Sequence, residues 1–307
     1  MTAVGGQFPE LDVSEWVRAH EETLGTKPKR WLQDPSTGTY WLMKDRTFNK
    51  RSDGSQYPKG DDWAERVAAG IAQQIGLPCA NVELATGGPG AETALGVISQ
   101  SVFGDNESLI HGNELLADIG IVGDDSHDRT GYTVTAVRAA LDQVGPTVEA
   151  EGASAWETFV GYLVLDALIG NTDRHQENWA VIAGPGGRRL APTFDHASSL
   201  GFQLDDEQRN ERLTTSDVNR TPEAYADRAI TRFEGKPSPV TVAVEALESL
   251  PVEHRQSCLS RCADVEELVA VIYLVPEHRM AEPSKQFAER LLRRNHARLL
   301  SHPFGTV

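Results

Sequence analysis

The chain has 307 residues and a hydrophobic fraction of 39%, so it can bury a sizeable core in one large domain or in two lobes. Its formal net charge of -16 argues against a general nucleic-acid binder, which needs a basic surface to displace the counterions of phosphates. Its three scattered cysteines provide no disulfide framework, and no apolar stretch reaches the roughly 20 residues that cross a bilayer, so we expect a cytoplasmic protein that is not embedded in a membrane.

The negative charge is unevenly distributed along the chain. Residues 1–60 contain nine Lys or Arg and eight Asp or Glu, whereas the rest of the chain is strongly acidic. A small polyanion should therefore prefer the N-terminal part, and the acidic C-terminal part would favour a basic partner. A solvated surface without a ligand is the alternative for any single lysine in this segment.

The first hundred residues predict the order strand, strand, helix, strand, strand. Residues 29–45 contain two aromatic, apolar runs around an Asp-Pro-Ser-Thr-Gly turn, a pattern typical of a β-hairpin, and Lys44 ends its second strand. Apolar residues recur at helical spacing over 61–78, a segment with acids at its start and Gly and Pro at its end. The segments 79–87 and 94–103 have strand composition, and the second is apolar enough to be central in a sheet.

Residues 104–152 are rich in Gly, Asp, Asn and Ser and predict a connector, with short helical pieces at 113–120 and 133–141. Helices should dominate after it. The segment 154–170 begins with a Ser154-x-x-Glu157 capping box and ends at Gly170, a residue typical of helix C-termini.

Further helices are expected from about residue 205. The last of them, at 283–302, carries four arginines that we interpret as a solvated face (Arg290, Arg293, Arg294 and Arg298). Cys258 and Cys262 are four residues apart, but no second pair completes a zinc site, so we interpret both as small core residues.

The stretch "GNTDRHQENWAVIAGPGGRRLAPTFD" (170–195) carries the polar residues that could do chemistry. It predicts two strands joined by the turn 184–187, with Asn178 beginning the first strand and Asp195 ending the second, so that both side chains lie nearly opposite each other. Amide and carboxylate oxygens side by side suit Mg²⁺. Asp173 precedes them in a loop, where a carboxylate can orient a substrate hydroxyl, as phosphoryl transfer requires.

Several of these residues also have structural interpretations. Asp and Asn are common near Gly-rich turns because they tolerate left-handed backbone. Lys44 is the best-placed cation for phosphates, and Glu65 on the following helix could orient it, but Asp62-Trp-Ala-Glu65 equally fits a capping box. His175 has no partner His or Cys at metal-binding spacing, which favours a structural or phosphate-facing role over a metal ligand.

The same stretch resembles the HipA-like kinases, whose catalytic loop has the pattern G-N-x-D-x-H-x-x-N followed by a later metal-binding Asp. It is also similar to the D-R-H-x-x-N of the phosphoinositide kinases. The resemblance implies that Asp173 is the catalytic base, that Asn178 and Asp195 bind Mg²⁺, that His175 supports the catalytic loop and that Lys44 contacts the phosphates of ATP. The helix from residue 61 is similar to the N-lobe helix of the family.

In that family a loop with Ser, Gly and a basic residue grips the nucleotide. The nearest match is "ETLGTKPKRWL", in which Gly25, Thr26 and Lys27 would contact ATP, and Thr23 or Thr26 could be modified. The toxin members of the family are longer and have an additional N-terminal β-domain, so this chain is similar in size to the shorter, stand-alone members.

These observations lead us to expect an α+β, two-lobed protein-kinase-like fold. Its parts would be a β-rich N-lobe at 1–103, a connector at 104–152 and a helical C-lobe at 153–307. The expected activity is transfer of phosphate from ATP, with Mg²⁺, to a hydroxyl, most simply as a serine/threonine protein kinase. A kinase of small molecules such as metabolites or antibiotics and an inactive nucleotide-binding regulator are the alternatives. The sequence predicts no oligomeric state.

Overall fold

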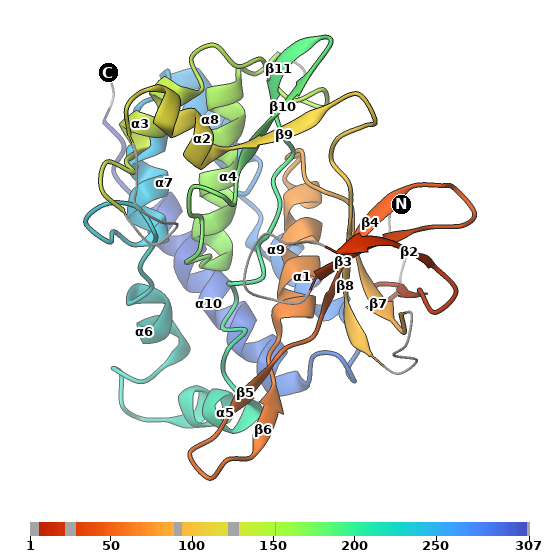
Figure 1. The fold of residues 1–307 in the computed structure, drawn as a ribbon. Coiled ribbons are helices and arrows are strands. Elements are labelled where there is room, and N and C mark those ends of the chain that lie inside the picture. The colour runs from red at the N-terminus through yellow and green to blue at the C-terminus, as the bar shows by residue number, and fades with distance from the viewer. Residues whose placement is uncertain (1–5, 22–28, 89–93, 122–128, 151, 306–307) are drawn as a thin grey trace.

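A computed structural model describes residues 6–21, 29–88, 94–121, 129–150 and 152–305. The N-terminal part is rich in β-strands and the C-terminal part is mainly helical, with helix α1 packed between them (Figure 1). The predicted α+β class, sheet first and helices later, is therefore confirmed. The limits proposed for the parts, at residues 103 and 152, stay predictions.

A six-stranded sheet forms most of the N-terminal part. Its spatial order is β1-β7-β8-β4-β3-β2, with β1 parallel to β7 and the other neighbours antiparallel. The strands are β1 (Glu10–Asp12), β2 (Val17–Glu21), β3 (Lys29–Gln33), β4 (Tyr40–Asp45), β7 (Val82–Thr86) and β8 (Leu95–Gln100). The predicted hairpin is β3–β4, and β8 is central as expected. A separate two-stranded hairpin that the sequence analysis did not predict consists of β5 (Phe48–Lys50) and β6 (Gln56–Pro58).

Helix α1 (Asp61–Gln74) connects the sheet to the helical part. It packs against β7 and β8 on one side and against helices α4 and α9 on the other. Gly76, with a φ of 67°, and Pro78 follow it, as the sequence predicts. The helix begins after an N-cap at Gly60, so Glu65 lies beyond the first turn and the capping-box alternative for Glu65 is wrong.

A second, three-stranded sheet lies beside the helices. Strand β9 (Ser108–His111) pairs with β10 (Ala180–Gly184), which pairs with β11 (Gly187–Leu190). The hairpin is centred on the predicted turn, but it is shorter than expected: β10 starts two residues after Asn178, and β11 ends five residues before Asp195. Asp195 has a φ of 59°. After Leu190 the chain leaves the hairpin, and Thr193 instead bridges Cys79 in the segment after α1, so the prediction that Asp195 ends a strand opposite Asn178 is wrong.

Helices make up most of the remaining chain. The predicted capping box of Ser154 and Glu157 begins α4, and Gly170 ends it in a left-handed conformation with φ 65°. The longest helix, α10, runs across the C-terminal part and packs against α4, α5, α6, α7 and α9 (Figure 1). The helices are α2 (Gly112–Asp118), α3 (Val134–Ala140), α4 (Ala155–Ile169), α5 (Asp206–Thr214), α6 (Pro222–Asp227), α7 (Pro239–Glu248), α8 (Val252–Ser260), α9 (Val265–Tyr273) and α10 (Glu282–Leu300).

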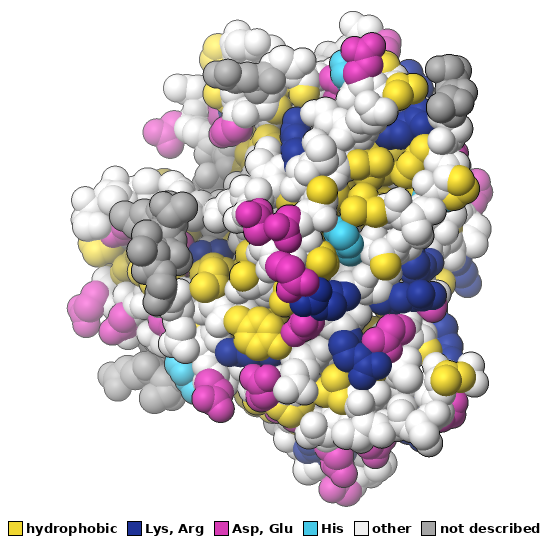
Figure 2. Space-filling model, turned by 180° about the vertical axis from the view of Figure 1, so that it is seen from behind, with side chains coloured by type: hydrophobic (Ala, Val, Ile, Leu, Met, Phe, Trp, Pro, Cys, Tyr) yellow, Lys and Arg dark blue, Asp and Glu magenta, His cyan; other side chains and the backbone are white. Residues whose placement is uncertain are grey.

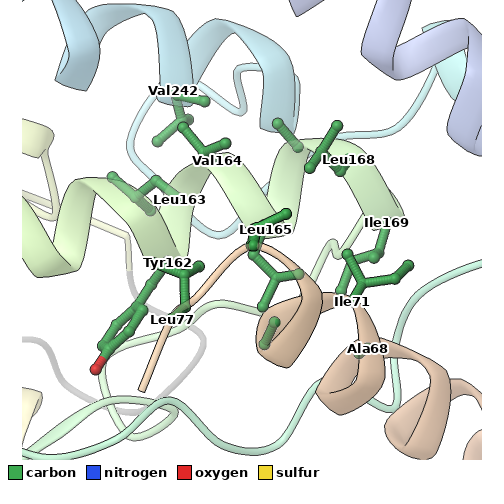
Figure 3. Close-up of a cluster of buried hydrophobic side chains, with 14 of the residues drawn as sticks. Ala68, Ile71, Leu77, Tyr162, Leu163, Val164, Leu165, Leu168, Ile169 and Val242 are labelled. Carbon is green, nitrogen blue, oxygen red and sulfur yellow. The ribbon is translucent and has the colours of Figure 1, made fainter. Parts of the chain in front are cut away.

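Helix α4 is the centre of the main hydrophobic core. Nearly all of its residues are buried, because α1 covers one side of it and α7 another. Figure 3 shows Leu165 and Ile169 directed toward Ile71 of α1, and Val164 directed toward Val242 of α7. Burial of this helix fixes the position of the loop that follows Gly170.

The surface carries charges of both signs close together. Figure 2 shows this mixture on one face, where Lys and Arg side chains lie beside Asp and Glu side chains. The four arginines of α10 all pair with acids, namely Glu223, Glu266, Glu289 and Asp227, which agrees with their interpretation as a solvated face. Among the described residues, no helix combines the length and apolar character that a membrane span requires. The three cysteines are free, Cys262 is buried and Cys258 packs against the core.

Candidate active site

The loop after α4 is held from inside by a buried ion pair. The guanidinium of Arg174, only 1% exposed, donates through Nε to Oδ2 of Asp166 at 2.7 Å and through Nη2 to Oδ1 at 2.9 Å. Its other contacts reach the carbonyl of Asn178 and the hydroxyl of Thr193. Burial opposes the charge of Arg174, but Asp166 raises its pKa above the usual range. One side chain thus joins α4, the loop and the segment that leads to Asp195.

Asp173 and Asn178 are held together within this loop. The side-chain amide of Asn178 donates to the carbonyl oxygen of Asp173 at 2.7 Å, and the amide of Asp173 donates to Oδ1 of Asn171 at 3.0 Å. Because Nδ2 of Asn178 is used inside the loop, its Oδ1 is the atom that can serve as an acceptor or a metal ligand. The carboxylate of Asp173 is only partly buried and can reach a substrate.

The Asp173 carboxylate has two neighbours that the sequence analysis did not predict. Nε of Arg232, from the segment between α6 and α7, donates to Oδ1 at 2.8 Å, and the hydroxyl of Ser198 donates to Oδ2 at 3.4 Å. Both come from segments 25 or more residues away in the chain. The proposed base is therefore also the partner of a cation.

Asp195 lies where the two parts of the protein meet. Nζ of Lys44, on β4 of the large sheet, donates to its Oδ1 at 2.9 Å, although the two residues are 151 positions apart. Nζ of Lys29, on β3, lies 3.9 Å from Oδ2. Lys29 and Lys44 are register partners in the hairpin, so both lysines extend from neighbouring strands toward the same carboxylate. Asp195 is also one of only three described non-glycine residues with positive φ, a conformation that costs about 1–2 kcal/mol and is typical of functional sites.

Glu65 is 1% exposed and near enough to Lys44 for their charges to interact. Burial raises the pKa of this carboxyl, but the nearby charge of Lys44 opposes the effect, and the net pKa of Glu65 is lowered. For Lys44, burial favours the neutral amine, yet Asp195 and Glu65 together raise its pKa above the usual value. Lys44 is therefore a cation between two acids, one on α1 and one after the hairpin.

A histidine that the sequence analysis missed completes this group. Nδ1 of His196, which is fully buried, lies 3.6 Å from Oε1 of Glu65, longer than a normal hydrogen bond, so the two groups are neighbours that are not hydrogen-bonded. Its Nε2 is 2.8 Å from the hydroxyl of Thr193, which in turn accepts from Arg174. His196 thus connects the Lys44–Glu65 group with the frame of the catalytic loop.

His175 has a supporting position in the loop. Its ring Nδ1 accepts from the amide of Glu177 at 3.2 Å, and its carbonyl accepts from the amide of Asn178 at 3.0 Å. Burial lowers the pKa of the imidazole, although Asp173 and Glu177 act in the opposite direction. These contacts lie within the loop, and the structural or phosphate-facing role expected for His175 stays a prediction.

The structure thus brings the predicted residues into two connected groups. Lys44, Glu65 and Asp195 form one, and the loop residues Asp173, His175 and Asn178 form the other. Gly25, Thr26 and Lys27, together with Thr23, lie outside the described residues. Lys29, the last residue of the loop expected to hold phosphates with Lys44, lies opposite Lys44 in the hairpin.

Comparisons with known proteins give the family. A family model described as the HipA-like C-terminal domain matches residues 22–252, well over half of the chain. The chain belongs to the HipA-like kinase family. No curated protein matches it with significant similarity.

Two solved structures resemble this HipA-like protein. The proinflammatory kinase CtkA of Helicobacter pylori has a TM-score of 0.71 and 18% sequence identity, and the match covers 97% of this chain and 100% of CtkA. HipA of Shewanella oneidensis MR-1, solved in a toxin–antitoxin complex with HipB and operator DNA, has a TM-score of 0.54 and 15% identity over 95% of this chain and 67% of its own. At these identities the likeness concerns the fold alone, and it confirms the predicted two-lobed, kinase-like architecture.

Proposed function

We propose that this HipA-like protein transfers the γ-phosphoryl group of ATP to a hydroxyl group, with Mg²⁺, and that it acts as a serine/threonine protein kinase. The observation that carries the proposal is the contact of Lys44 with Asp195 at 2.9 Å, with the buried Glu65 near enough to the lysine for their charges to interact. A cation from the sheet, its orienting acid and a carboxylate from the helical part are the groups that phosphoryl transfer needs in one place.

The residues present fit a magnesium ion. Mg²⁺ is bound in phosphoryl-transfer sites by one or two carboxylates together with substrate oxygens and water. The carboxylate of Asp195 and Oδ1 of Asn178, whose Nδ2 already donates within the loop, are donor atoms of that kind. Bound there, Mg²⁺ would neutralise the negative charge of the phosphates.

Asp173 would act on the acceptor. The acceptor oxygen attacks the γ-phosphorus, a new O–P bond forms, and the bond from that phosphorus to the β–γ bridging oxygen breaks, so ADP leaves with the bond's electrons. The hydroxyl proton passes to the carboxylate of Asp173. Lys44 holds phosphate oxygens throughout, and Arg174 keeps the loop in place from the buried side. Because these contacts already hold the catalytic loop in place, little of the substrate's binding energy is needed to order the loop.

The activity can be tested with γ-labelled ATP, Mg²⁺ and purified protein, alone and with cell lysate. Labelled products are separated by gel and by thin-layer chromatography. Wild type is compared with Asp173→Asn and Asp195→Asn, and Asp142→Asn on the exposed surface is the matched control. We expect metal-dependent labelling of protein, lowered by roughly 10²–10⁴-fold in Asp173→Asn and unchanged in the control.

The other outcomes separate the alternatives. Label found only on small molecules would replace the protein kinase by a small-molecule phosphotransferase. If wild type binds ATP tightly but transfers no phosphate, and Asp195→Asn behaves in the same way, the proposal is contradicted and a nucleotide-binding regulator is favoured. A fully active Asp173→Asn enzyme would remove Asp173 from its role as base.

A further inference from the structure

A pocket of about 510 Å³ lies beside the candidate catalytic loop. Its wall includes Thr172 next to Asp173, Ser198, and the segment around α6. Ser198 also donates to the Asp173 carboxylate, so the pocket continues directly to the proposed base. A molecule in the pocket could place a hydroxyl at Asp173.

The lining of the pocket is basic, in contrast to the protein as a whole. Four arginines line it (Arg129, Arg212, Arg228 and Arg232), and none of its described lining residues is an acid. The chain has 45 Asp and Glu against 29 Lys and Arg, so a group of arginines without acids is unexpected on charge alone. The charges of the lining residues are therefore opposite in sign to the net charge of the chain.

Three of these arginines, all except Arg232, have no ion pair with an acid in the described part of the chain, unlike those of α10. Arg212 donates to the carbonyl of Arg220 and lies over the ring of Tyr225, with 5.3 Å between its Cζ and the ring centroid. Arg228 donates to the carbonyl of Asn219. Neither forms an ion pair with an acid in the described part of the chain. Nη1 of Arg129 is buried and, within the same described part, has no hydrogen-bond partner.

Arg232 connects the pocket to the reaction. Its Nε binds Oδ1 of Asp173 at 2.8 Å, and the two side chains are 31% and 28% exposed. A carboxylate brought by an acceptor would compete with Asp173 for this guanidinium. Binding of such an acceptor would therefore free the carboxylate of Asp173 from Arg232 when the acceptor's hydroxyl reaches it.

We propose that the acceptor is a serine- or threonine-containing peptide segment with acidic residues next to the hydroxyl, and that the arginine pocket binds those acids. This inference rests on the proposed kinase function and names its substrate class. Charge-assisted bonds from guanidinium to carboxylate are the strong, specific contacts that such recognition needs. It replaces the expectation, drawn from net charge, that a basic partner would be favoured.

The test uses the full chain and three labelled peptides that differ only beside the serine, with Glu, Gln or Lys as neighbours. Peptide binding is measured by fluorescence anisotropy, and transfer by γ-labelled ATP with Mg²⁺. Arg228→Gln and Arg212→Gln change the pocket. Arg188→Gln, at an exposed position on β11 outside the pocket lining, is the matched control, and unfolding midpoints check that all variants fold.

We expect the Glu peptide to bind most tightly and the Lys peptide least. Each pocket variant should weaken binding of the Glu peptide and raise its KM by roughly threefold to tenfold, with little change in kcat. At high salt the difference in affinity between variant and wild type should be smaller. The control should behave as wild type.

Other outcomes would overturn the inference. They are equal binding of the Glu and Lys peptides, pocket variants that bind the Glu peptide as wild type does, or displacement of that peptide by inorganic phosphate at equal concentration, which would indicate a site for small anions. Failure of the kinase proposal is distinguishable, because then no peptide is phosphorylated by wild type even though the anisotropy arm still reports the charge preference.

Discussion

Lys44 and Asp195 are 151 residues apart in the chain, and their side chains meet at 2.9 Å between Nζ and Oδ1. This contact joins the central region of the sheet to the segment after the catalytic loop. The buried Glu65 adds a second negative charge near the lysine, so the charge of Lys44 is stabilised from both parts of the protein.

Replacing Lys44 by Met should remove the phosphate-binding cation while keeping the length of the side chain. We expect kcat/KM for ATP-dependent transfer to fall by about 10²-fold or more, because charge stabilisation at the transferred group is a large part of phosphoryl-transfer catalysis. Steady-state kinetics with γ-labelled ATP measure the effect. Lys50→Met, on the exposed β5, is the matched control and should keep full activity. A Lys44→Met enzyme with wild-type kcat/KM would contradict the assignment.

The buried pair of Arg174 and Asp166 should be a large contributor to stability. Arg174→Met leaves the carboxylate of Asp166 buried without its counter-charge, and breaking such a pair costs about 3–5 kcal/mol. The free energy of unfolding, measured by urea denaturation, should fall by that amount. Arg188→Met, on the exposed side of β11, should change it by less than about 0.5 kcal/mol. A loss below 1 kcal/mol in Arg174→Met would show that other contacts hold the loop.

The elements with local signals were predictable from the sequence. The capping box of Ser154, the left-handed Gly170 and the turn at 184–187 each depend on residues only a few positions apart, and all three are found. Strands β5 and β6 were missed because each has three residues, too few for a periodic pattern.

Tertiary contacts explain where the site prediction was incomplete. The strand after the turn was predicted to run to Asp195, but its pairing with β10 ends at Leu190, and Thr193 bridges Cys79 instead. The hydrogen bond between Arg232 and Asp173 joins residues 59 positions apart, so no local sequence pattern could predict it. The resemblance proposed the site residues, and the fold adds which of them touch, as Lys44 touches Asp195.

Acid should weaken the anchor between the β8–β9 connection and the hairpin. Hydrogen bonds from Arg189, and then from the amide of Gly104, lower the pKa of Glu107 from 4.5 to about 2. A carboxyl with a lowered folded pKa stabilises the fold above its unfolded pKa, and this contribution is lost as the pH falls from about 4.5 toward 2.

In Glu107→Gln this acid-sensitive contribution is absent. The thermal midpoint of the variant should therefore fall less between pH 6 and pH 3 than that of wild type. Glu253→Gln, at an exposed position on α8, is the control and should follow wild type. An identical pH dependence for wild type and Glu107→Gln would contradict this role of the Arg189 contact.

The contribution of α4–α7 packing to the free energy of unfolding should be measurable by shortening one buried side chain, Val164. Val164 is 1% exposed and directed toward Val242, which is 2% exposed (Figure 3). Val164→Ala removes two methyl groups from a close-packed core, and we expect a loss of about 2 kcal/mol in the free energy of unfolding. Val148→Ala is the same chemical change at a position that is 73% exposed, and it should cost less than about 0.5 kcal/mol. Equal losses for the two variants would mean that the α4–α7 contact is not close-packed. A loss at Val164 alone would confirm that the helix before the catalytic loop is fixed by this core.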